Sequence, residues 1–340
     1  MQSFLDIQKR LLPDLLEVMQ ERYVILRYIG YMQPVGRRSL AVSLGYTERV
    51  LRAQVEFLKD QNLITAGVAG MYLTQEGRNL LEDLEGLMRE LKGIDVMEME
   101  LKHRLGIRNA IIVPGDSDTS PLVKTEIGRA TALCMKKLLN GKNIIAVTGG
   151  STMSAVAEEL GPDLSSEEIM FVPARGGIGE DVQNQANTIT AIMAAKTNGR
   201  HRVFYVPDQV SLDIYESFIK EPIVHEVLGL IKSARMVLHG IGDAKTMAER
   251  RKTQAADMEK ILSNKAVAEA FGYYFNEQGE IVHKVLTIGL QLDDLINVPD
   301  VLAVAGGSSK AKAIRSYMKR APRQTILVTD EGAAKLILQN

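Results

Sequence analysis

The sequence predicts an α/β protein of two domains, a winged helix-turn-helix followed by a domain built on a parallel β-sheet. Residues 13–74 follow the order helix, short helix, glycine turn, capped helix and β-hairpin. From Ala110 onward, short apolar runs alternate with helical patterns, as in parallel sheets covered by helices. A proline-free stretch, residues 76–100, lies between these patterns. We therefore expect domains at residues 1–90 and 106–340, joined by a helical linker that reaches about residue 105.

Composition and cysteine content fit a cytoplasmic protein with a full core. The 340 residues are 46% hydrophobic and 24% charged, with a formal net charge of −1. This balance argues against general coating of nucleic acid but allows a small DNA-reading patch. The single Cys134 fits a reducing compartment, and its helical spacing with Ile127 predicts a core position. We expect no membrane partner, because no signal peptide and no apolar run of roughly 20 residues is present.

Residues typical of helix termini mark the bounds of the first two predicted helices. Apolar residues at helical spacing predict a helix over residues 13–29, which Gly30 and Pro34 are expected to end. Serine is a preferred residue at helix N-termini, so we expect Ser39 to cap a short second helix.

The turn, the third helix and the wing follow. Gly45 is expected to make a tight turn, and Thr47 to cap a third helix with Leu51 on its buried side. Residues 63–74 contain two short β patterns separated by a stretch with two glycines, which predicts the hairpin known as the wing.

The exposed positions of this domain indicate DNA binding. A recognition helix contacts base edges from its N-terminal part, where arginine can pair with guanine and glutamate with cytosine. The expected DNA-contacting residues are Arg37, Arg38, Ser39, Thr47, Glu48, Arg49, Arg52, Gln54 and Tyr72. Operator double-stranded DNA is the expected partner. The alternatives are a winged helix that contacts another protein and a solvated charged face.

The linker carries leucines at four-three spacing, namely Leu80, Leu84, Leu87, Leu91 and Ile94. Two heptads are too few to define a coiled coil. A helix packed on its own domain and a dimer seam are both open at this point.

Seven apolar runs of the second domain are strand candidates, at residues 110–113, 143–148, 169–173, 202–206, 235–241, 301–305 and 325–328. Helical patterns separate most of them, which predicts parallel crossovers. The order changes at Lys265–Phe271, where we expect a helix, followed by a polar hairpin around Gly279. No Walker sequence is present and no GxGxxG follows a strand, which argues against nucleotide-binding folds.

Two similar turns follow strand candidates and predict phosphate binding. The first is NIIAVTGGSTM at residues 143–153, and the second is VLAVAGGSSK at residues 301–310. Backbone N–H groups at a strand end and a helix N-terminus attract phosphate. Lys310 would be unfavourable near a helix N-terminus unless an anion were present. The two turns could hold two phosphates of one sugar or a single phosphate.

Other loops at strand ends add candidate ligands. Arg175, in the glycine-rich loop PARGG, could pair bidentately with a phosphate. The polar residues 181–185 suit sugar hydroxyls. A basic cluster at residues 247–252 either closes over an anion or forms a solvated face.

No catalytic or metal-binding group is predicted. The five histidines lack metal-ligand spacing, and His239 is expected to be a core residue. The acidic pairs Asp293–Asp294 and Asp330–Glu331 are not predicted as acid-base couples, because sequence neighbours point in different directions, and both pairs are expected to be solvated surface charge.

The motifs VTGGSTM, PARGG, a GIG turn and LAVAGGSSK, with the winged helix, resemble the SorC/DeoR family of sugar-responsive bacterial transcription regulators over nearly the whole chain. The resemblance implies a Rossmann-like effector and oligomerisation domain similar to sugar-phosphate isomerases and deaminases. It implies effector contacts at Gly149, Gly150, Ser151, Thr152, Arg175, Gly176, Gln185, Arg250, Glu269, Gly307, Ser308, Ser309 and Lys310.

The resemblance also implies a repressor of glycolytic genes whose operator binding a phosphosugar weakens or remodels. Fructose-1,6-bisphosphate is the implied effector, and the paired glycine turns favour a doubly phosphorylated sugar. We expect a homo-oligomer, dimer or tetramer, without a cofactor. The alternative is a phosphosugar isomerase or deaminase with an accessory DNA-binding domain. Glu269 could be its acid-base group, in a stretch that reads as a buried or half-buried helix.

Overall fold

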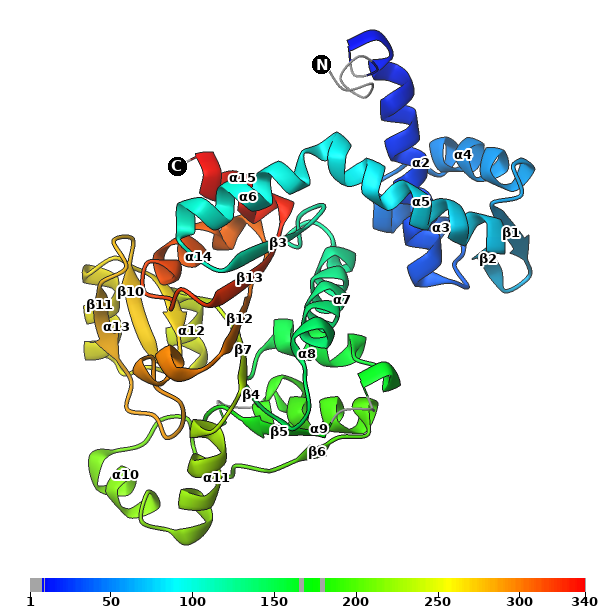
Figure 1. Cartoon of the computed structure of the whole chain (residues 1–340). Coiled ribbons are helices and arrows are strands. Elements are labelled where there is room, and N and C mark those ends of the chain that lie inside the picture. Colours follow the sequence, from blue (N-terminus) through cyan, green and yellow to red (C-terminus); the bar gives the residue numbers. More distant parts are fainter. Residues whose placement is uncertain (1–7, 9, 165–167, 178–180, 340) are drawn as a thin grey trace. The chain divides into compact units, whose positions relative to one another are not determined.

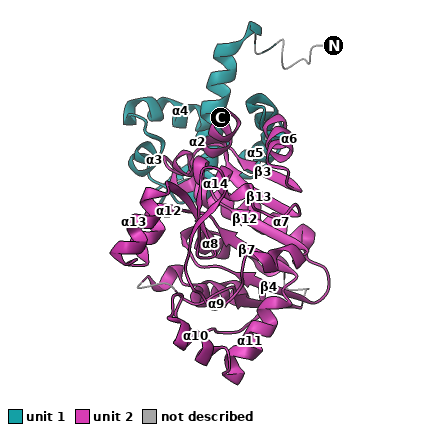
Figure 2. Cartoon of the chain, turned by 90° about the vertical axis from the view of Figure 1, so that its left-hand side faces the viewer, with its two compact units in different colours: residues 1–95 teal, residues 96–340 magenta. Residues whose placement is uncertain are grey.

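The computed structural model describes residue 8 and residues 10–164, 168–177 and 181–339. The chain divides into two compact units, Met1–Asp95 and Val96–Asn340, which Figure 2 shows in different colours. Among the described residues, no helix combines the length and the apolar character that crossing a membrane requires.

The first unit is a helix-turn-helix with a wing. Its elements are α2 (Pro13–Met32), α3 (Arg37–Leu44), α4 (Glu48–Asp60), β1 (Ile64–Gly67), β2 (Gly70–Leu73) and α5 (Gln75–Lys92). One apolar cluster joins them and includes Ile29, Leu40 and Leu51. Thr47 caps α4 by accepting a hydrogen bond from Val50 N, and Gly45 makes the turn at φ 68°. The antiparallel pairing of β1 with β2 forms the wing. The predicted order of elements is confirmed.

Two expectations in this unit are wrong. Gly30 does not end α2, which continues to Met32. A Cβ at Gly30 would lie 2.9 Å from a Leu73 methyl group, so this glycine serves close packing inside the helix. Ser39 does not cap α3, which begins at Arg37 after Gly36. The extended Val35 exchanges backbone hydrogen bonds with Met71 of the wing, which brings the chain to Gly36 ready to start the helix.

The linker is two helices. Helix α5 ends at Gly93, whose left-handed φ of 64° closes the last turn, and α6 (Ile94–Leu105) follows at once. Met88 and Leu91 of α5 are buried with Tyr23 of α2. The α5 part of the leucine pattern therefore packs within the first unit.

The second unit is built on a seven-stranded parallel sheet in the order β3-β13-β12-β7-β4-β5-β6 (Figure 1). The strands are β3 (Asn109–Val113), β4 (Asn143–Val147), β5 (Ile169–Pro173), β6 (Arg200–His201), β7 (Met236–Gly240), β12 (Asp300–Val304) and β13 (Thr325–Asp330). The chain runs outward from β4 to β6, returns to β7 beside β4, and then continues the other way through β12 and β13. The topological switch therefore lies between β4 and β7.

Helices α7 (Pro121–Leu138), α8 (Ser151–Glu159) and α9 (Ala186–Thr197) cover one face of the sheet. Alternate strand residues such as Leu302 and Val304 face these helices, as period-two alternation requires. Cys134 lies in this core, where burial raises the pKa of its thiol to about 11, so its predicted core position is confirmed. The remaining helices are α10 (Leu212–Phe218), α11 (Pro222–Lys232), α12 (Ala244–Arg250), α13 (Ala255–Ser263), α14 (Ala311–Met318) and α15 (Glu331–Gln339).

A four-stranded sheet in the order β11-β10-β9-β8 adds to this domain. Its strands are β8 (Gly242–Asp243), β9 (Ala266–Ala270), β10 (Tyr273–Asn276) and β11 (Ile281–Lys284). The helix expected at Lys265–Phe271 is wrong, because β9 pairs with both β8 and β10 and this pairing overrides local propensity. The hairpin around Gly279 is confirmed.

The strand expected at residues 202–206 is also wrong. The edge strand β6 ends at His201, and beyond it Phe204 pairs its backbone N–H and C=O with the Asn187 side chain of α9. The chain therefore leaves the sheet edge one residue before the apolar run begins.

Candidate functional site

A pocket lies at the carboxyl ends of β4, β5 and β7, at the topological switch of the sheet. Ligands of open parallel sheets bind at this position, because the loops there diverge and leave a crevice. Most of the predicted effector residues line it, namely Gly149, Gly150, Ser151, Thr152, Arg175, Gly176, Gln185, Arg250, Glu269 and Lys310. The pocket therefore brings together residues from several loops, which no single loop could supply.

The first glycine turn leaves the N-terminus of α8 open. Gly150 occupies the N-cap position at φ 120°, and no side chain caps the helix. Gly149 needs to be glycine, because a Cβ there would lie 2.7 Å from Asn184 O. Gly150 N donates to that same oxygen at 2.8 Å. Gly150 N is therefore already paired, and the uncapped first turn of α8, which begins with Ser151 and Thr152, is the part of this turn suited to an anion.

Two lysines from other elements reach this turn. Lys310 lines the pocket, and Lys124 of α7 donates to Ser151 Oγ at 2.7 Å. Both lysine residues are half-buried. Burial lowers the pKa of Lys124. Burial and then the charge of Lys124 lower the pKa of Lys310, although Asp118, Asp243 and Asp330 act in the opposite direction.

The second glycine turn differs, because carboxylates of the protein already fill it. Asp118 accepts from Ser309 N at 2.7 Å and from both serine hydroxyls of the turn. Asp116 accepts from Ser308 N at 3.2 Å, and Asp330 from Gly307 N at 2.6 Å. Of the four predicted residues here, only Lys310 lines the pocket, so Gly307, Ser308 and Ser309 are not placed at the candidate site.

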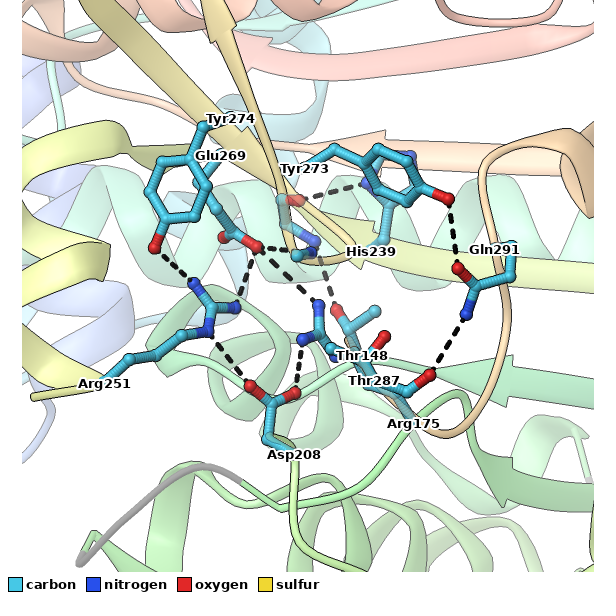
Figure 3. A network of polar contacts seen from close by, with 12 residues as sticks. Thr148, Arg175, Asp208, His239, Arg251, Glu269, Tyr273, Tyr274, Thr287 and Gln291 are labelled. Carbon is cyan, nitrogen blue, oxygen red and sulfur yellow. Dashed lines mark hydrogen bonds and ion pairs between the residues drawn. The ribbon is translucent and has the colours of Figure 1, made fainter. Parts of the chain in front are cut away.

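Arg175 belongs to a buried network of ion pairs (Figure 3). Asp208 and Glu269 bridge the guanidinium groups of Arg175 and Arg251. Arg251 also donates to Tyr274 Oη at 3.0 Å. The four charged side chains are 2–6% exposed, and their formal charges cancel. Burial opposes the charge on Arg251, yet Glu269 and Asp208 raise the pKa of this arginine.

This network corrects two expectations. Arg175 is not a free cation at a strand end, because its charge is matched by two buried carboxylates. Glu269 lies on β9 rather than on a helix, opposite Gly242 of β8, and this pairing puts it at the pocket wall. Its Oε1 accepts from Arg251 at 2.8 Å and from Gly272 N at 2.7 Å.

At the other side of the pocket, Gly176 packs against the backbone of a neighbouring loop, whereas Gln185 is half-buried and Arg250 is exposed. A Cβ at Gly176 would lie 2.4 Å from Pro207 O, so glycine is required for this close approach. Gly176 N donates a hydrogen bond to Ile288 O at 3.2 Å. Gln185 is the N-cap residue of α9 and is half-buried. Arg250 ends α12, lines the pocket and is exposed.

The remaining titratable candidates lie in the core. His239 is fully buried, and burial lowers its pKa to about 4. Its Nδ1 faces Gly240 O at 3.0 Å and its Nε2 faces Tyr317 Oη at 3.2 Å, so the predicted core role is confirmed. The pair Asp330–Glu331 is not solvated, because both side chains are buried and accept backbone hydrogen bonds. Within the described ranges, no three His, Cys, Asp or Glu side chains gather as metal ligands.

The first unit presents an exposed arginine surface on its recognition helix. Arg49 and Arg52 are exposed on α4, and Tyr72 is exposed on the wing. Arg52 lies 3.4 Å from Glu56, an exposed pair that binds weakly and can exchange for phosphate. Gln54 differs from its neighbours, because its Oε1 accepts from Arg22 of α2 at 3.0 Å. The geometry therefore does not support Gln54 as a base contact.

Four residues at or beside the site escaped sequence reasoning, namely Asp118, Lys124, Asp208 and Arg251. Asp208 and Lys124 lie in stretches without a glycine turn, so no local signal marks them. Arg251 was visible in the basic cluster, but the cluster did not reveal which arginine is buried.

Comparison with known proteins agrees with this geometry. A family model described as a putative sugar-binding domain matches residues 89–339, and one described as the CggR N-terminal DNA binding domain matches residues 18–88. The central glycolytic genes regulator of Bacillus subtilis (strain 168) is 58% identical over 340 residues, covering all of both chains. Its counterpart from Priestia megaterium is 58% identical over 341 residues, covering all of this chain and 99% of the other.

Solved structures agree as well. A putative SorC family transcriptional regulator from Enterococcus faecalis has 50% identity and a TM-score of 0.68, over 71% of this chain and 99% of that one. The full-length sorbitol operon regulator SorC from Klebsiella pneumoniae has 18% identity and a TM-score of 0.67, over 93% of this chain and 97% of that one, which shows the common fold. The chain therefore belongs to the SorC family of bacterial transcriptional regulators, which join a DNA-binding domain to a sugar-binding domain.

Proposed function

We propose that the protein is a repressor of glycolytic genes whose operator binding is weakened or remodelled by fructose-1,6-bisphosphate. The observation that carries the effector class is the uncapped N-terminus of α8 beside Lys310, in one pocket with the exposed Arg250. A helix N-terminus and two separate cations suit a ligand with two phosphates. The names of the relatives support the glycolytic target.

The two glycine turns have different roles in this proposal. One phosphate binds at Ser151 and Thr152 with Lys310, where the helix N-terminus is open. The second glycine turn is filled by Asp116 and Asp118, so the other phosphate is directed toward Arg250. Sugar hydroxyls lie between these ends, within reach of polar pocket residues such as Gln185.

The hydrogen bonds and ion pairs of the buried carboxylates support a regulator rather than an enzyme. Glu269 already accepts hydrogen bonds from Arg251 and Gly272 N, and Asp208 is held between two arginines. An isomerase or deaminase needs a carboxylate free to take a proton beside the sugar carbon. Turnover of a phosphosugar that disappears in Glu269→Gln would contradict this part of the proposal.

The test uses the full chain. An operator is first selected from random double-stranded DNA, and its affinity is then measured with and without saturating fructose-1,6-bisphosphate. We expect a changed affinity or a changed oligomer, since a ligand shifts an equilibrium only by its differential affinity for the two states. Sedimentation of the same samples reports the oligomer, which we propose to be a dimer or tetramer. If the bisphosphate changes neither, the effector assignment is wrong.

The assignment of phosphates is tested by comparing ligands. Ser151→Ala and Arg250→Ala are titrated with fructose-1,6-bisphosphate, fructose-1-phosphate and fructose-6-phosphate. We expect the bisphosphate to lose affinity in both variants, because each removes the partner of one phosphate. Equal binding of bisphosphate and monophosphates by the unaltered protein would contradict two separate phosphate sites.

A further inference from the structure

Lys124 is a cation that the effector site does not account for. It lies in the first turns of α7 and is not one of the described residues that line the pocket, but it donates at 2.7 Å to Oγ of Ser151, which does line it. Its side chain is half-buried. Within the described part of the chain Lys124 forms no ion pair, whereas the charges of Asp118, Asp243 and Asp330 favour the charged form of Lys310.

The position is electrostatically unfavourable for a cation. Ser151 is the first residue of α8, where the helix dipole places partial positive charge. Lys310 is close enough that Lys124 acts on its charge, and both groups have lost part of their contact with water. The ammonium group of Lys124, the nearby charge of Lys310 and the N-terminus of α8 therefore all favour the same kind of occupant.

We propose that Lys124 is a direct ligand of the phosphate that binds at Ser151, and that it shares this phosphate with Lys310. The inference rests on the proposed phosphosugar effector and adds a residue from α7 to its site. A phosphate ester carries a charge of about −1.5 to −2 near neutral pH, which two lysines and a helix N-terminus match better than one lysine does. The pair thus selects phosphorylated sugars against sugars with a single negative charge.

The geometry also allows a structural role, in which Lys124 only ties α7 to α8 through Ser151. Helices α7 and α8 already pack closely elsewhere, since a Cβ at Gly128 would lie 2.6 Å from Ala155 O. The two roles predict opposite effects in the absence of ligand. Removing a tie lowers the melting temperature, whereas removing one of two like charges leaves it unchanged or raises it.

The experiment compares four full-length proteins, unaltered, Lys124→Gln, Lys124→Arg and Lys137→Gln. Lys137 is an exposed lysine on the same helix and controls for the loss of one positive charge. Each is titrated calorimetrically with fructose-1,6-bisphosphate and with inorganic phosphate, and the melting temperature is recorded without ligand. Glutamine keeps a donor for Ser151 but not the charge, and arginine keeps both.

We expect Lys124→Gln to weaken binding of both ligands roughly ten- to a hundredfold, the range for a lost charge-assisted hydrogen bond. Lys124→Arg should recover most of the affinity, Lys137→Gln should bind as the unaltered protein does, and no variant should melt lower. A Kd within twofold of the unaltered value in Lys124→Gln, or a loss of affinity that comes with a lower melting temperature and is shared by Lys124→Arg, would overturn the inference.

The two proposals fail differently. If the unaltered protein binds inorganic phosphate but not the bisphosphate, the effector assignment falls, and the phosphate titration still decides the role of Lys124. If it binds the bisphosphate and Lys124→Gln binds it equally well, only the role of Lys124 falls. If it binds neither, both are wrong.

Discussion

Asp118 accepts a 2.7 Å hydrogen bond from Ser309 N and places its carboxylate in the second glycine turn. Desolvation opposes its charge, but the hydrogen bonds from Ser309 and Ser308 lower the pKa of Asp118 below its ordinary value. Asp118 is exposed, and the two serines hold its carboxylate in the turn. The protein thus supplies its own anion where sequence reasoning expects a phosphate.

Removing that anion should open the turn. We expect Asp118→Ala to bind inorganic phosphate several-fold more tightly, because Ser309 N and the serine hydroxyls lose their partner while Lys310 remains. Calorimetric titration measures the change. Asp163→Ala, which removes an exposed carboxylate bound to Lys136, is the control for net charge. An unchanged phosphate affinity in Asp118→Ala would show that the turn does not bind anions.

Substitutions of the neighbours Arg250 and Arg251 should affect different properties, ligand affinity for Arg250 and the free energy of unfolding for Arg251. Arg251→Met leaves Asp208 and Glu269 with half of their buried positive charge, which should cost about 3–5 kcal/mol of unfolding free energy. Arg250→Met removes an exposed side chain, so its stability should be unchanged while the bisphosphate binds more weakly. Urea denaturation and ligand titration of both variants measure the two effects. Equal stability losses in both variants would contradict the assignment.

The buried His239 should make the second unit less stable in mild acid. Its pKa is about 4 in the folded protein and near 6.5 when unfolded, so between these values only the unfolded chain takes up the proton. Stability contributed by the neutral histidine is complete above pH 6.5 and is lost as the pH falls toward 4, by about 3 kcal/mol.

Denaturation at several pH values measures this loss. Other groups also titrate in this range, so the difference in pH slope between the unaltered protein and His239→Gln isolates the histidine. The variant is expected to have the shallower slope. Identical slopes would show that His239 takes up no proton on unfolding.

Substitutions of exposed cations on the recognition helix should reduce DNA affinity by amounts that depend on their position. Arg49→Ala removes an exposed cation from the N-terminal part of α4 and should weaken operator binding and reduce discrimination against altered operators. Lys59→Ala removes an exposed cation from the last turn of the same helix and should change neither. Fluorescence anisotropy at two salt concentrations measures both, since the loss of a phosphate contact would also reduce the salt dependence of binding. Unchanged operator affinity together with unchanged discrimination in Arg49→Ala would argue for a protein-contacting surface.

Local sequence signals were sufficient where the structure is decided locally. Thr47 caps its helix because a threonine hydroxyl can reach the N–H three residues on, and Gly45 turns the chain because glycine tolerates a positive φ. The position of the first glycine turn at the pocket also follows from a local signal. The strand ends in two glycines, and no side chain caps the helix that begins at Ser151.

Tertiary structure decided the rest, because partners from distant segments change what a residue can do. Arg175 reads as a free phosphate ligand until Asp208 and Glu269 neutralise it, and Glu269 reads as helical until β8 and β10 pair with its strand. Asp118 and Lys124 carry no motif, yet one fills a glycine turn and the other reaches Ser151. The sequence by itself determined which turns end a strand in two glycines and two hydroxyl residues, whereas the folded chain decided which of those turns its own carboxylates fill.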